Sequence, residues 1–405
     1  MSSRYRVDYH LKEHRRDEFI TWIKALVSTP FVLNTIESIN NNNNNNTVNR
    51  YCEILQDIEM LIIDHINNPQ LSKLSKLVPS IGKFFTVLPL VDAFKIQDNR
   101  RCISKRKFVA PSFNDIRQIL NTAQLIALKD NLKLITFDGD ITLYEDGNNL
   151  EGNSPILKYL LELLKMGVVI GIVTAAGYNQ SNKYYERLFG LIDGIKESEE
   201  LSLKQKENLL VIGGESNYLL RYNNEISGLQ MESSKDWLLD EMKLWDDKEI
   251  ERILSFGYGL LKEFTELLNI NDKILIIVKE RAVGIIPREG IKLEREILEE
   301  IVLRIDKSLR EKFQDSNINW CAFNGGRDVW IDIGDKSLGV RILQNFVNKE
   351  VGEIIINESN TLHVGDQFAS LGNNDYASRT AAATAWVASP SETEILLNDL
   401  VDYMM

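Results

Sequence analysis

Cysteine and histidine are scarce in this chain of 405 residues, which holds three cysteines and four histidines. Cys52, Cys102 and Cys321 are odd in number and far apart, so the sequence predicts neither a disulfide framework nor a cysteine zinc site. The scattered histidines likewise give no reason to expect a histidine-rich metal site. A reducing cytoplasm is the simplest location for a chain of this composition.

Long hydrophobic runs and excess positive charge are also missing. No apolar run approaches the ~20 residues of a membrane span, and the first ten residues lack the hydrophobic segment of a secretory signal. The formal net charge of -12 argues against nonspecific nucleic-acid binding, which requires a basic surface. We therefore expect neither a membrane nor a nucleic acid as partner. A phosphorylated substrate is still compatible with this charge, because a metal ion and a few local cations can offset it.

The length of the chain suggests two or three domains. Residues 1–125 show apolar residues at helical spacing and no strand signals, which predicts a helical N-terminal region. The asparagine run Asn40–Asn46 interrupts it and is expected to form a flexible loop. Residues 191–324 hold short strands grouped with two long helices, without strict alternation, and are expected to form an inserted α+β cap. Residues 126–190 and 325–405 would then form an α/β core with a parallel sheet.

The core is predicted around one stretch, in which the apolar run Leu134–Phe137 is followed by Asp138 and Asp140. A short, fully apolar run is typical of a buried parallel strand, and open α/β sheets bind ligands at the carboxyl ends of such strands. Two carboxylates so close together disfavour each other's ionisation, and a bound Mg²⁺ would remove the conflict. One carboxylate could then attack phosphorus while the other transfers a proton.

Three further signals follow in order. Thr174 ends the next predicted strand, where its hydroxyl could hold a phosphoryl oxygen. Lys336 opens an amphipathic helix, a position that the helix dipole disfavours unless an anion lies nearby. Asp366 ends another predicted strand, with Asn374 and Asp375 in the polar segment that follows. These residues would meet at one edge of the sheet.

This ordered set resembles the haloacid-dehalogenase-like phosphohydrolases over residues 132–190 and 325–390. The resemblance implies a Rossmann-like α/β core with an inserted cap that usually decides the substrate. It also implies that Asp138 is the nucleophile that becomes phosphorylated, and that Asp140 is the general acid and then the general base. Thr174 and Lys336 would bind the transferring phosphoryl group. Asp366 would complete an Mg²⁺ site with Asp138 and the backbone carbonyl of Asp140, and Asn374 and Asp375 would support that site without binding the ion.

A closer resemblance covers nearly the whole chain. Phe-Asp-Gly-Asp-Ile-Thr-Leu-Tyr, Thr-Ala-Ala-Gly-Tyr, Gly-Gly-Glu-Ser-Asn-Tyr-Leu and Gly-Gly-Arg-Asp-Val-Trp-Ile-Asp-Ile-Gly-Asp-Lys are similar to the IMP-specific 5′-nucleotidases of fungi and apicomplexan parasites. This resemblance implies Mg²⁺-dependent hydrolysis of inosine 5′-monophosphate to inosine and phosphate, within purine nucleotide breakdown or salvage. It also implies a homo-oligomer, expected to be a tetramer, that ATP activates through the N-terminal region.

Substrate and effector contacts are hypotheses. Trp330 and Asp332 share one face of a predicted strand close to Lys336, so Trp330 could pack near the base. Asp332, alone or with Arg327, could hydrogen-bond the base or the ribose. Asp146 is either a substrate contact or a turn residue, and Trp330 is either a base contact or a core residue. For ATP, the basic cluster at Arg100 and Arg101 is the best candidate in the sequence, with the alternatives of a solvated loop or a site that includes His10 and His14.

Three other functions are compatible with the four-motif core. A phosphotransferase or sugar phosphomutase would pass the phosphoryl group from Asp138 to a sugar instead of water. A phosphatase could act on another nucleotide, such as nicotinamide mononucleotide. A sensor without activity would bind a nucleotide only, but it would not need the complete set of catalytic residues.

Overall fold

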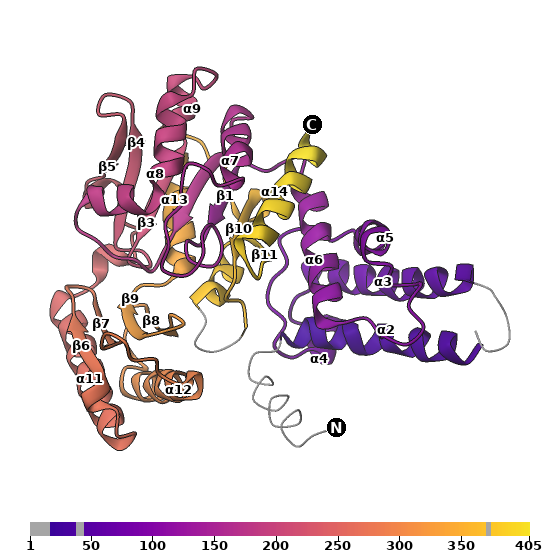
Figure 1. Cartoon of the computed structure of the whole chain (residues 1–405), viewed down its shortest axis with the longest axis horizontal. Helices are drawn as coiled ribbons and strands as arrows, with labels where there is room; N and C mark the ends of the chain where they lie inside the picture. The colour runs from indigo at the N-terminus through magenta and orange to yellow at the C-terminus, as the bar shows by residue number, and fades with distance from the viewer. Residues whose placement is uncertain (1–16, 38–43, 370–373) are drawn as a thin grey trace.

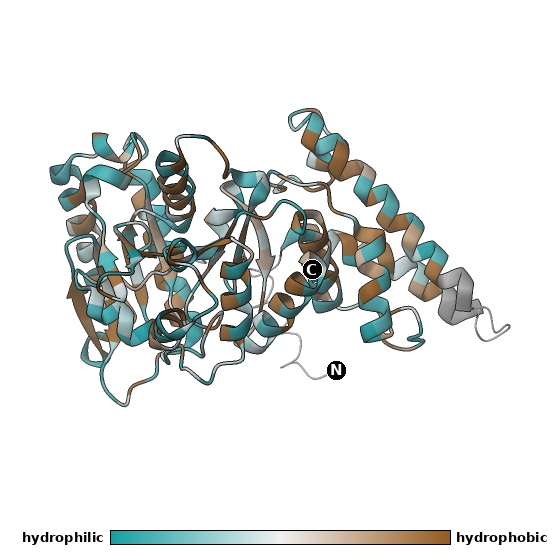
Figure 2. Cartoon of the chain, turned by 90° about the horizontal axis from the view of Figure 1, so that it is seen from above, coloured by the Kyte–Doolittle hydropathy of each residue, from teal (hydrophilic) through white to brown (hydrophobic). Residues whose placement is uncertain are grey.

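The helical N-terminal region lies to one side of the molecule in the computed structural model, which describes residues 17–37, 44–369 and 374–405 (Figure 1). Its elements are α2 (Glu18–Glu37), α3 (Asn44–Asn67), α4 (Lys73–Leu77), α5 (Leu90–Arg101) and α6 (Phe113–Leu128). Their apolar faces form one buried cluster that includes Ile23, Leu55 and Phe94. In Figure 2 these helices carry hydrophobic and hydrophilic residues side by side along their length, as expected for helices with one buried face.

The start of α6 agrees with the sequence, since Ser112 caps it in a capping box with Asp115. The asparagine run differs from the expectation, because Asn44 already begins α3, and the earlier part of the run lies outside the described residues. Helix α5 has no predicted counterpart. It places Arg100 and Arg101 in its last turn, where cations interact favourably with the helix dipole.

The core is a seven-stranded sheet in the order β11-β10-β1-β2-β3-β4-β5. The five strands β1 (Leu134–Phe137), β2 (Val169–Val173), β3 (Leu209–Gly213), β10 (Thr361–Gly365) and β11 (Ala383–Trp386) are parallel, whereas β4 (Tyr218–Asn223) and β5 (Gly228–Met231) add an antiparallel hairpin. Helix α13 (Lys336–Val351) packs on one face. Helices α7 (Ile156–Lys165), α8 (Ser181–Glu197) and α14 (Pro390–Met404) pack on the other. Both faces are therefore covered, which is why every residue of β1 and β2 is buried.

The cap is a second, antiparallel sheet in the order β6-β7-β9-β8. It consists of β6 (Ile274–Val278), β7 (Ala282–Pro287), β8 (Trp320–Asn324) and β9 (Val329–Ile333), and the long helices α11 (Asp247–Leu267) and α12 (Arg295–Lys312) pack against it. Short elements connect the larger ones: α9 (Leu203–Lys206), α10 (Ser234–Trp237), η2 (Met242–Leu244), η3 (Asn271–Lys273), η4 (Glu358–Asn360) and η5 (Asn374–Thr380). Figure 1 shows the cap beneath the carboxyl ends of the core strands.

The boundaries between the strands of the core sheet and those of the cap sheet differ from the predicted domain boundaries. Strands β3, β4 and β5 were expected in the cap but extend the core sheet, and β9 was expected in the core but pairs with β7 and β8 in the cap. The place of β9 in the cap sheet explains why Trp330 and Asp332 alternate with apolar residues along the strand. One face of the cap sheet packs on helices, while the other lines a cavity.

None of the helices within residues 17–37, 44–369 and 374–405 combines the length and the hydrophobicity that a membrane span requires.

Candidate active site

Asp138 and Asp140 lie in a tight turn directly after β1. The Asp138 amide donates a hydrogen bond to the Val364 carbonyl of the neighbouring strand β10, at 2.9 Å. Ile141 then adopts a left-handed backbone conformation, with φ of 60°, and the Gly139 carbonyl accepts a bond from the Leu143 amide at 2.8 Å. A side chain at position 139 would collide with the Tyr144 hydroxyl, so this turn requires glycine.

Lys336 lies between two carboxylates at the start of α13. Its ammonium group is 2.8 Å from Asp138 Oδ1 and 2.6 Å from Asp375 Oδ1, and its side chain has no exposed surface. Burial alone would lower the pKa of this ammonium, but Asp138, Asp375 and Glu215 together hold it above its ordinary value. The two nearby anions therefore explain a cation at a helix N-terminus.

Three carboxylates gather at the edge of the sheet. Asp138, Asp366 and Asp375 each offer an oxygen within 4.8 Å of the others. Burial, together with the neighbouring carboxylates and against the effect of Lys336, raises the pKa of Asp138 to about 7. The same causes raise the pKa of Asp366 well above its usual range. Asp366 Oδ1 is buried, and none of the described residues forms a hydrogen bond with it. A set of hard oxygen donors with an unpartnered buried atom fits Mg²⁺, which prefers such ligands.

Asp375 differs from the other two carboxylates because protein donors occupy both of its oxygens. Oδ1 accepts from Lys336 and, at 3.2 Å, from Nε2 of His363, while Oδ2 accepts from the Gln367 amide at 2.8 Å. Burial would raise the pKa of Asp375, but Lys336 and His363 hold it well below its usual range. The supporting role of Asp375 stays a prediction.

His363 is a part of the site that the sequence did not predict. It is fully buried in β10, and its Nδ1 lies 2.9 Å from the Thr136 hydroxyl of β1. Burial lowers its pKa, which favours a neutral ring. A neutral ring with the proton on Nε2 donates to Asp375 and accepts from Thr136, so that both contacts are satisfied.

Glu215, in the turn after β3, also escaped prediction. It is buried, has a φ of 64°, and accepts a hydrogen bond from Asn374 Nδ2 at 3.1 Å. Burial raises the pKa of its carboxyl well above the usual range. Nearby, Asn217 Nδ2 donates to the Ile333 carbonyl at 2.6 Å, which connects this turn to the end of the cap strand β9. The signal that could have identified the turn is its position after a parallel core strand.

Thr174 and Asp140 each accept a local backbone hydrogen bond. Thr174 Oγ1 accepts from the Ala176 amide at 3.1 Å, and Asp140 Oδ1 accepts from the Gly147 amide at 3.0 Å. Both residues line a cavity of about 320 Å³ between the core and the cap, which Asp138 and Asn374 also line. The structure thus brings these predicted residues to one cavity.

The cap side of this cavity contains the predicted substrate residues. Trp330, Asp332 and Arg327 line it, together with Asp146 from the core. Arg327 Nε pairs with Asp146 Oδ2 at 3.0 Å, so this ion pair joins the cap to the turn after β1. Burial raises the pKa of Asp332 to about 7. Its Oδ1 has no hydrogen-bond partner within residues 17–37, 44–369 and 374–405. Further lining residues that the sequence analysis did not select are Arg187, Asn217, Tyr218, Lys279, Arg281, Phe323 and Asp328.

The predicted effector residues lie elsewhere. Arg100 donates to Asp399 Oδ1 at 2.9 Å, and Arg101 Nε donates to Asp115 Oδ1 at 2.8 Å. Both cations therefore take part in ion pairs that join α5 to α14 and α6. His10 and His14 lie outside the described residues.

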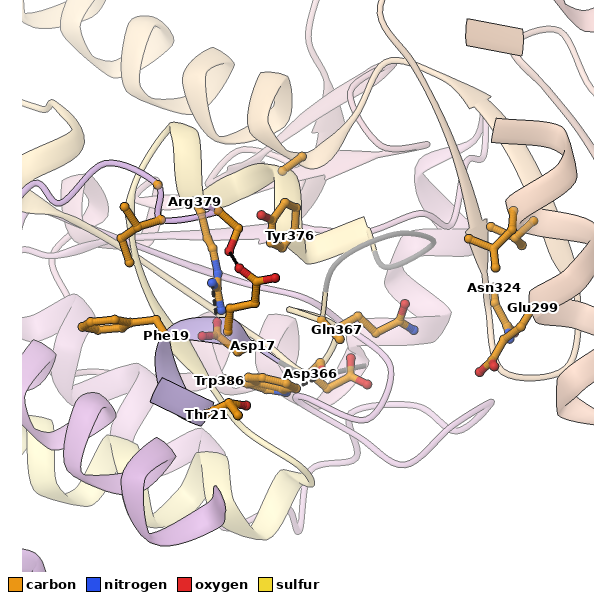
Figure 3. A pocket seen from close by; sticks show the side chains of 18 of the residues that line it. Asp17, Phe19, Thr21, Glu299, Asn324, Asp366, Gln367, Tyr376, Arg379 and Trp386 are labelled. Carbon is orange, nitrogen blue, oxygen red and sulfur yellow. Dashed lines mark hydrogen bonds and ion pairs between the residues drawn. The ribbon is translucent and has the colours of Figure 1, made fainter. Parts of the chain in front are cut away.

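A second, larger cavity of about 1510 Å³ lies beside the carboxylates, between α2, α12 and η5 (Figure 3). Asp366, Gln367 and Trp386 belong to its lining. Across it, Arg379 pairs with Asp17 at 2.6 Å and connects the start of α2 to η5, the element that carries Asp375. Asp366 is thus accessible from the side of the helical region.

Known proteins match this chain over nearly its whole length. A family model described as IMP-specific 5′-nucleotidase matches residues 1–397. The IMP-specific 5′-nucleotidase 1 of Candida albicans is 47% identical, with 100% of both chains covered. That of Saccharomyces cerevisiae is 45% identical, with 99% of this chain and 100% of the relative covered.

Two solved structures are similar in fold over nearly the same span. The IMP-bound form of a mutant Plasmodium falciparum IMP-nucleotidase has a TM-score of 0.83 and 33% identity, covering 96% of this chain and 94% of that chain. The ATP-bound form of the Plasmodium falciparum enzyme has a TM-score of 0.81 and 35% identity, covering 98% of this chain and 87% of that chain. The expected α/β core with a parallel sheet is confirmed.

Proposed function

The chain belongs to the IMP-specific 5′-nucleotidase family of phosphoric monoester hydrolases, and from this membership we propose that it hydrolyses IMP through a phosphorylated Asp138. The observation that carries the proposal is the pairing of Asp138 with Lys336 at the edge of a cavity between the core and the cap. A family member that had lost its activity would have no need to keep a fully buried lysine on this carboxylate.

In the proposed first step, a carboxylate oxygen of Asp138 attacks phosphorus and the bond to the 5′ oxygen of the nucleoside breaks. Lys336 and Thr174 would hold the phosphoryl oxygens and offset their charge. Asp140 would donate its proton to the departing 5′ oxygen, and the nucleoside that carries this oxygen leaves as inosine. The hydrogen bond from Gly147 orients the Asp140 carboxyl for this transfer.

In the second step, Asp140 would take a proton from water, and the resulting nucleophile attacks phosphorus. The bond between phosphorus and the Asp138 oxygen breaks, which releases phosphate and restores the free carboxylate. Mg²⁺, held by Asp138, Asp366 and the backbone carbonyl of Asp140, would supply the positive charge that offsets the crowded carboxylates and the phosphate. Asp375, fixed by Lys336 and His363, would keep these groups in place.

The cap would select the nucleotide. Trp330 would pack on the base, and Asp332, with Arg327 and Asp146, would hydrogen-bond the base or the ribose. The supporting observation is that these side chains converge on one cavity, where Asp332 has an unpartnered oxygen. Unpaired polar atoms in a binding site discriminate strongly, because the wrong ligand leaves them unsatisfied.

ATP activation and assembly into a tetramer belong to the same proposal. The solved relative with bound ATP supports the first. We assign the effector site to the helical region near Arg100 and Arg101, where ATP would compete with the ion pairs that these arginines make. The three free cysteines fit a reducing cytoplasm as the place of action.

The test is phosphate release with Mg²⁺ across nucleoside monophosphates and sugar phosphates, with and without ATP. We expect IMP to be preferred and ATP to raise the rate. Asp138→Asn should abolish turnover and covalent labelling by phosphate, whereas Asp140→Asn should reduce turnover and still permit labelling. Preference for a sugar phosphate, or transfer to an added sugar instead of phosphate release, would contradict the proposal and favour a phosphatase or phosphomutase of another specificity.

A further inference from the structure

The peptide group between Asp366 and Gln367 is held on both sides. Its carbonyl oxygen accepts a hydrogen bond from the Trp386 indole Nε1 at 2.7 Å, and its N–H donates to Asp375 Oδ2 at 2.8 Å. Figure 3 shows Trp386 beside Asp366 with this contact drawn. Because a peptide group is planar, two bonds on opposite sides fix its orientation. They thereby fix the backbone from which the Asp366 carboxylate projects.

Trp386 is itself held by the helical region. It ends β11 at the edge of the core sheet, and its backbone exchanges two hydrogen bonds with the Asn121 side chain of α6, at 2.7 and 3.0 Å. Arg117 of α6 also donates to its carbonyl. Asn121 and Arg117 are buried, and Phe113, the first residue of α6, packs edge-on against the indole at 5.6 Å. The ring therefore has few alternative positions.

From these contacts we infer that Trp386 is a positioning residue that aligns Asp366 for metal binding and connects this alignment to helix α6. The inference rests on the proposed function, because it assumes that Asp366 binds Mg²⁺. The reason for the role lies in the free oxygen of Asp366. Asp375 is fixed directly by three donors. Asp366 Oδ1, in contrast, has no partner among the residues that the structure describes and depends on its backbone for its direction.

The test compares two changes that each remove one indole N–H. Trp386→Phe deletes the donor to Asp366 and keeps an aromatic ring in place. Trp237→Phe is the matched control: Trp237 is buried, donates to the Glu232 carbonyl at 3.3 Å, and lines neither of the two cavities. In each full-length protein, Mg²⁺ binding is measured without substrate, as the rise in melting temperature along an Mg²⁺ titration. The Mg²⁺ dependence of IMP hydrolysis is measured in parallel.

We expect two Mg²⁺ concentrations to rise roughly 10-fold in Trp386→Phe, since outer partners of metal ligands typically have effects of this size. One is the concentration at which the melting temperature begins to rise, and the other is the concentration for half-maximal IMP hydrolysis. The control should match the wild type, and KM for IMP at saturating Mg²⁺ should stay unchanged. If Trp386 has only a structural role, its replacement would lower the melting temperature of the metal-free protein and leave both Mg²⁺ concentrations unchanged. That result would overturn the inference.

Two further outcomes separate the inference from the proposed function. A wild-type protein that neither binds Mg²⁺ nor hydrolyses IMP refutes the function itself. If Trp386→Phe does not fold, Phe113→Leu loosens the same ring from the α6 side without removing a hydrogen bond. A shift of these Mg²⁺ concentrations in that variant supports the role of Trp386, and unchanged concentrations reject it.

Discussion

The replacement of Lys336 by methionine should reveal how strongly the site depends on one buried cation. Lys336 has no exposed side-chain surface and contacts Asp138 at 2.8 Å and Asp375 at 2.6 Å. Methionine keeps the length of the stem and removes the charge. When one partner of a buried ion pair is removed, the other charge stays uncompensated, and the protein loses about 3–5 kcal/mol of unfolding free energy. Because the pair is fully buried, solvent screening does not reduce this value.

The measurement is urea unfolding in metal-free buffer at pH 7, so that bound Mg²⁺ cannot mask the charge. Asp375→Asn and the double variant complete a mutant cycle. The double variant should be more stable than the sum of the two single effects by about 1–3 kcal/mol, because residues in one buried network couple by this amount. Its catalytic rate should stay as low as that of Lys336→Met, since the phosphoryl group still lacks its cation.

The effect of Lys336→Met should also depend on pH in a definite direction. The pKa of Asp375 lies below its usual range in the folded protein because Lys336 and His363 outweigh the effect of burial. A lowered carboxylate pKa stabilises the fold above the ordinary pKa of about 4, and this contribution disappears as the pH falls through the folded pKa. The difference between wild type and variant should therefore be largest near pH 7 and narrow below about pH 4. A cost under 1 kcal/mol at pH 7, or a cost that grows toward acid, would refute the reasoning.

Changes at three other places have expected outcomes. Asp332→Ala should alter the preference among nucleotides more than the turnover of a simple aryl phosphate, and an equal loss of both would show a structural or catalytic role. Since the pKa of Asp332 is raised to about 7, its contribution to stability falls as the pH rises from about 4 to 7, and Asp332→Asn should make the urea midpoint less sensitive to pH in this window. Changing Arg100 and Arg101 together to glutamine should remove ATP activation and leave the basal rate unchanged. Asp399→Asn is the control, because it breaks only the ion pair of Arg100 and should keep activation. If activation persists in the double variant, the effector site lies elsewhere. Gly139→Ala should reduce IMP hydrolysis more than 10-fold, because the new methyl group collides with a tyrosine hydroxyl in the turn that carries the nucleophile. Circular dichroism should show little change of secondary structure. A fully active variant would show that the turn can relax.

The residues that could be predicted from sequence are those whose local context carries the signal. Asp138 and Thr174 each follow a short apolar run, Asp366 follows a strand that mixes polar and apolar residues, and parallel strands bring their carboxyl ends to one edge. Lys336 stood out because it opens a helix against the dipole. The two long cap helices were likewise predicted from their own periodicity.

The missed residues depend on partners far along the chain. In its local sequence, His363 looks like one more residue of a buried strand. Its role depends on its contacts with Asp375 and with Thr136, which lies 227 positions earlier. Trp386 closes a short strand of small residues and is defined by α6 on one side and Asp366 on the other. The cap boundary was misplaced for a related reason: a hairpin such as β4–β5 looks the same in sequence whether it extends one sheet or begins another.

The position of β1 inside the core sheet, between β10 and β2, has a consequence for the order in which the protein can fold. One neighbour of β1 is β2, which follows it closely, but the other is β10, and the pair Thr136 and His363 is separated by 227 residues. During synthesis the strand that carries the nucleophile therefore keeps one edge of unpaired backbone N–H and C=O groups until the cap and α13 have been made. Such distant parallel pairing is slow, because the loop between the strands must close first, and an exposed strand edge invites pairing with other chains. Assembly of the active site and protection of the nascent chain from aggregation are thus completed by the same late event, the insertion of β10.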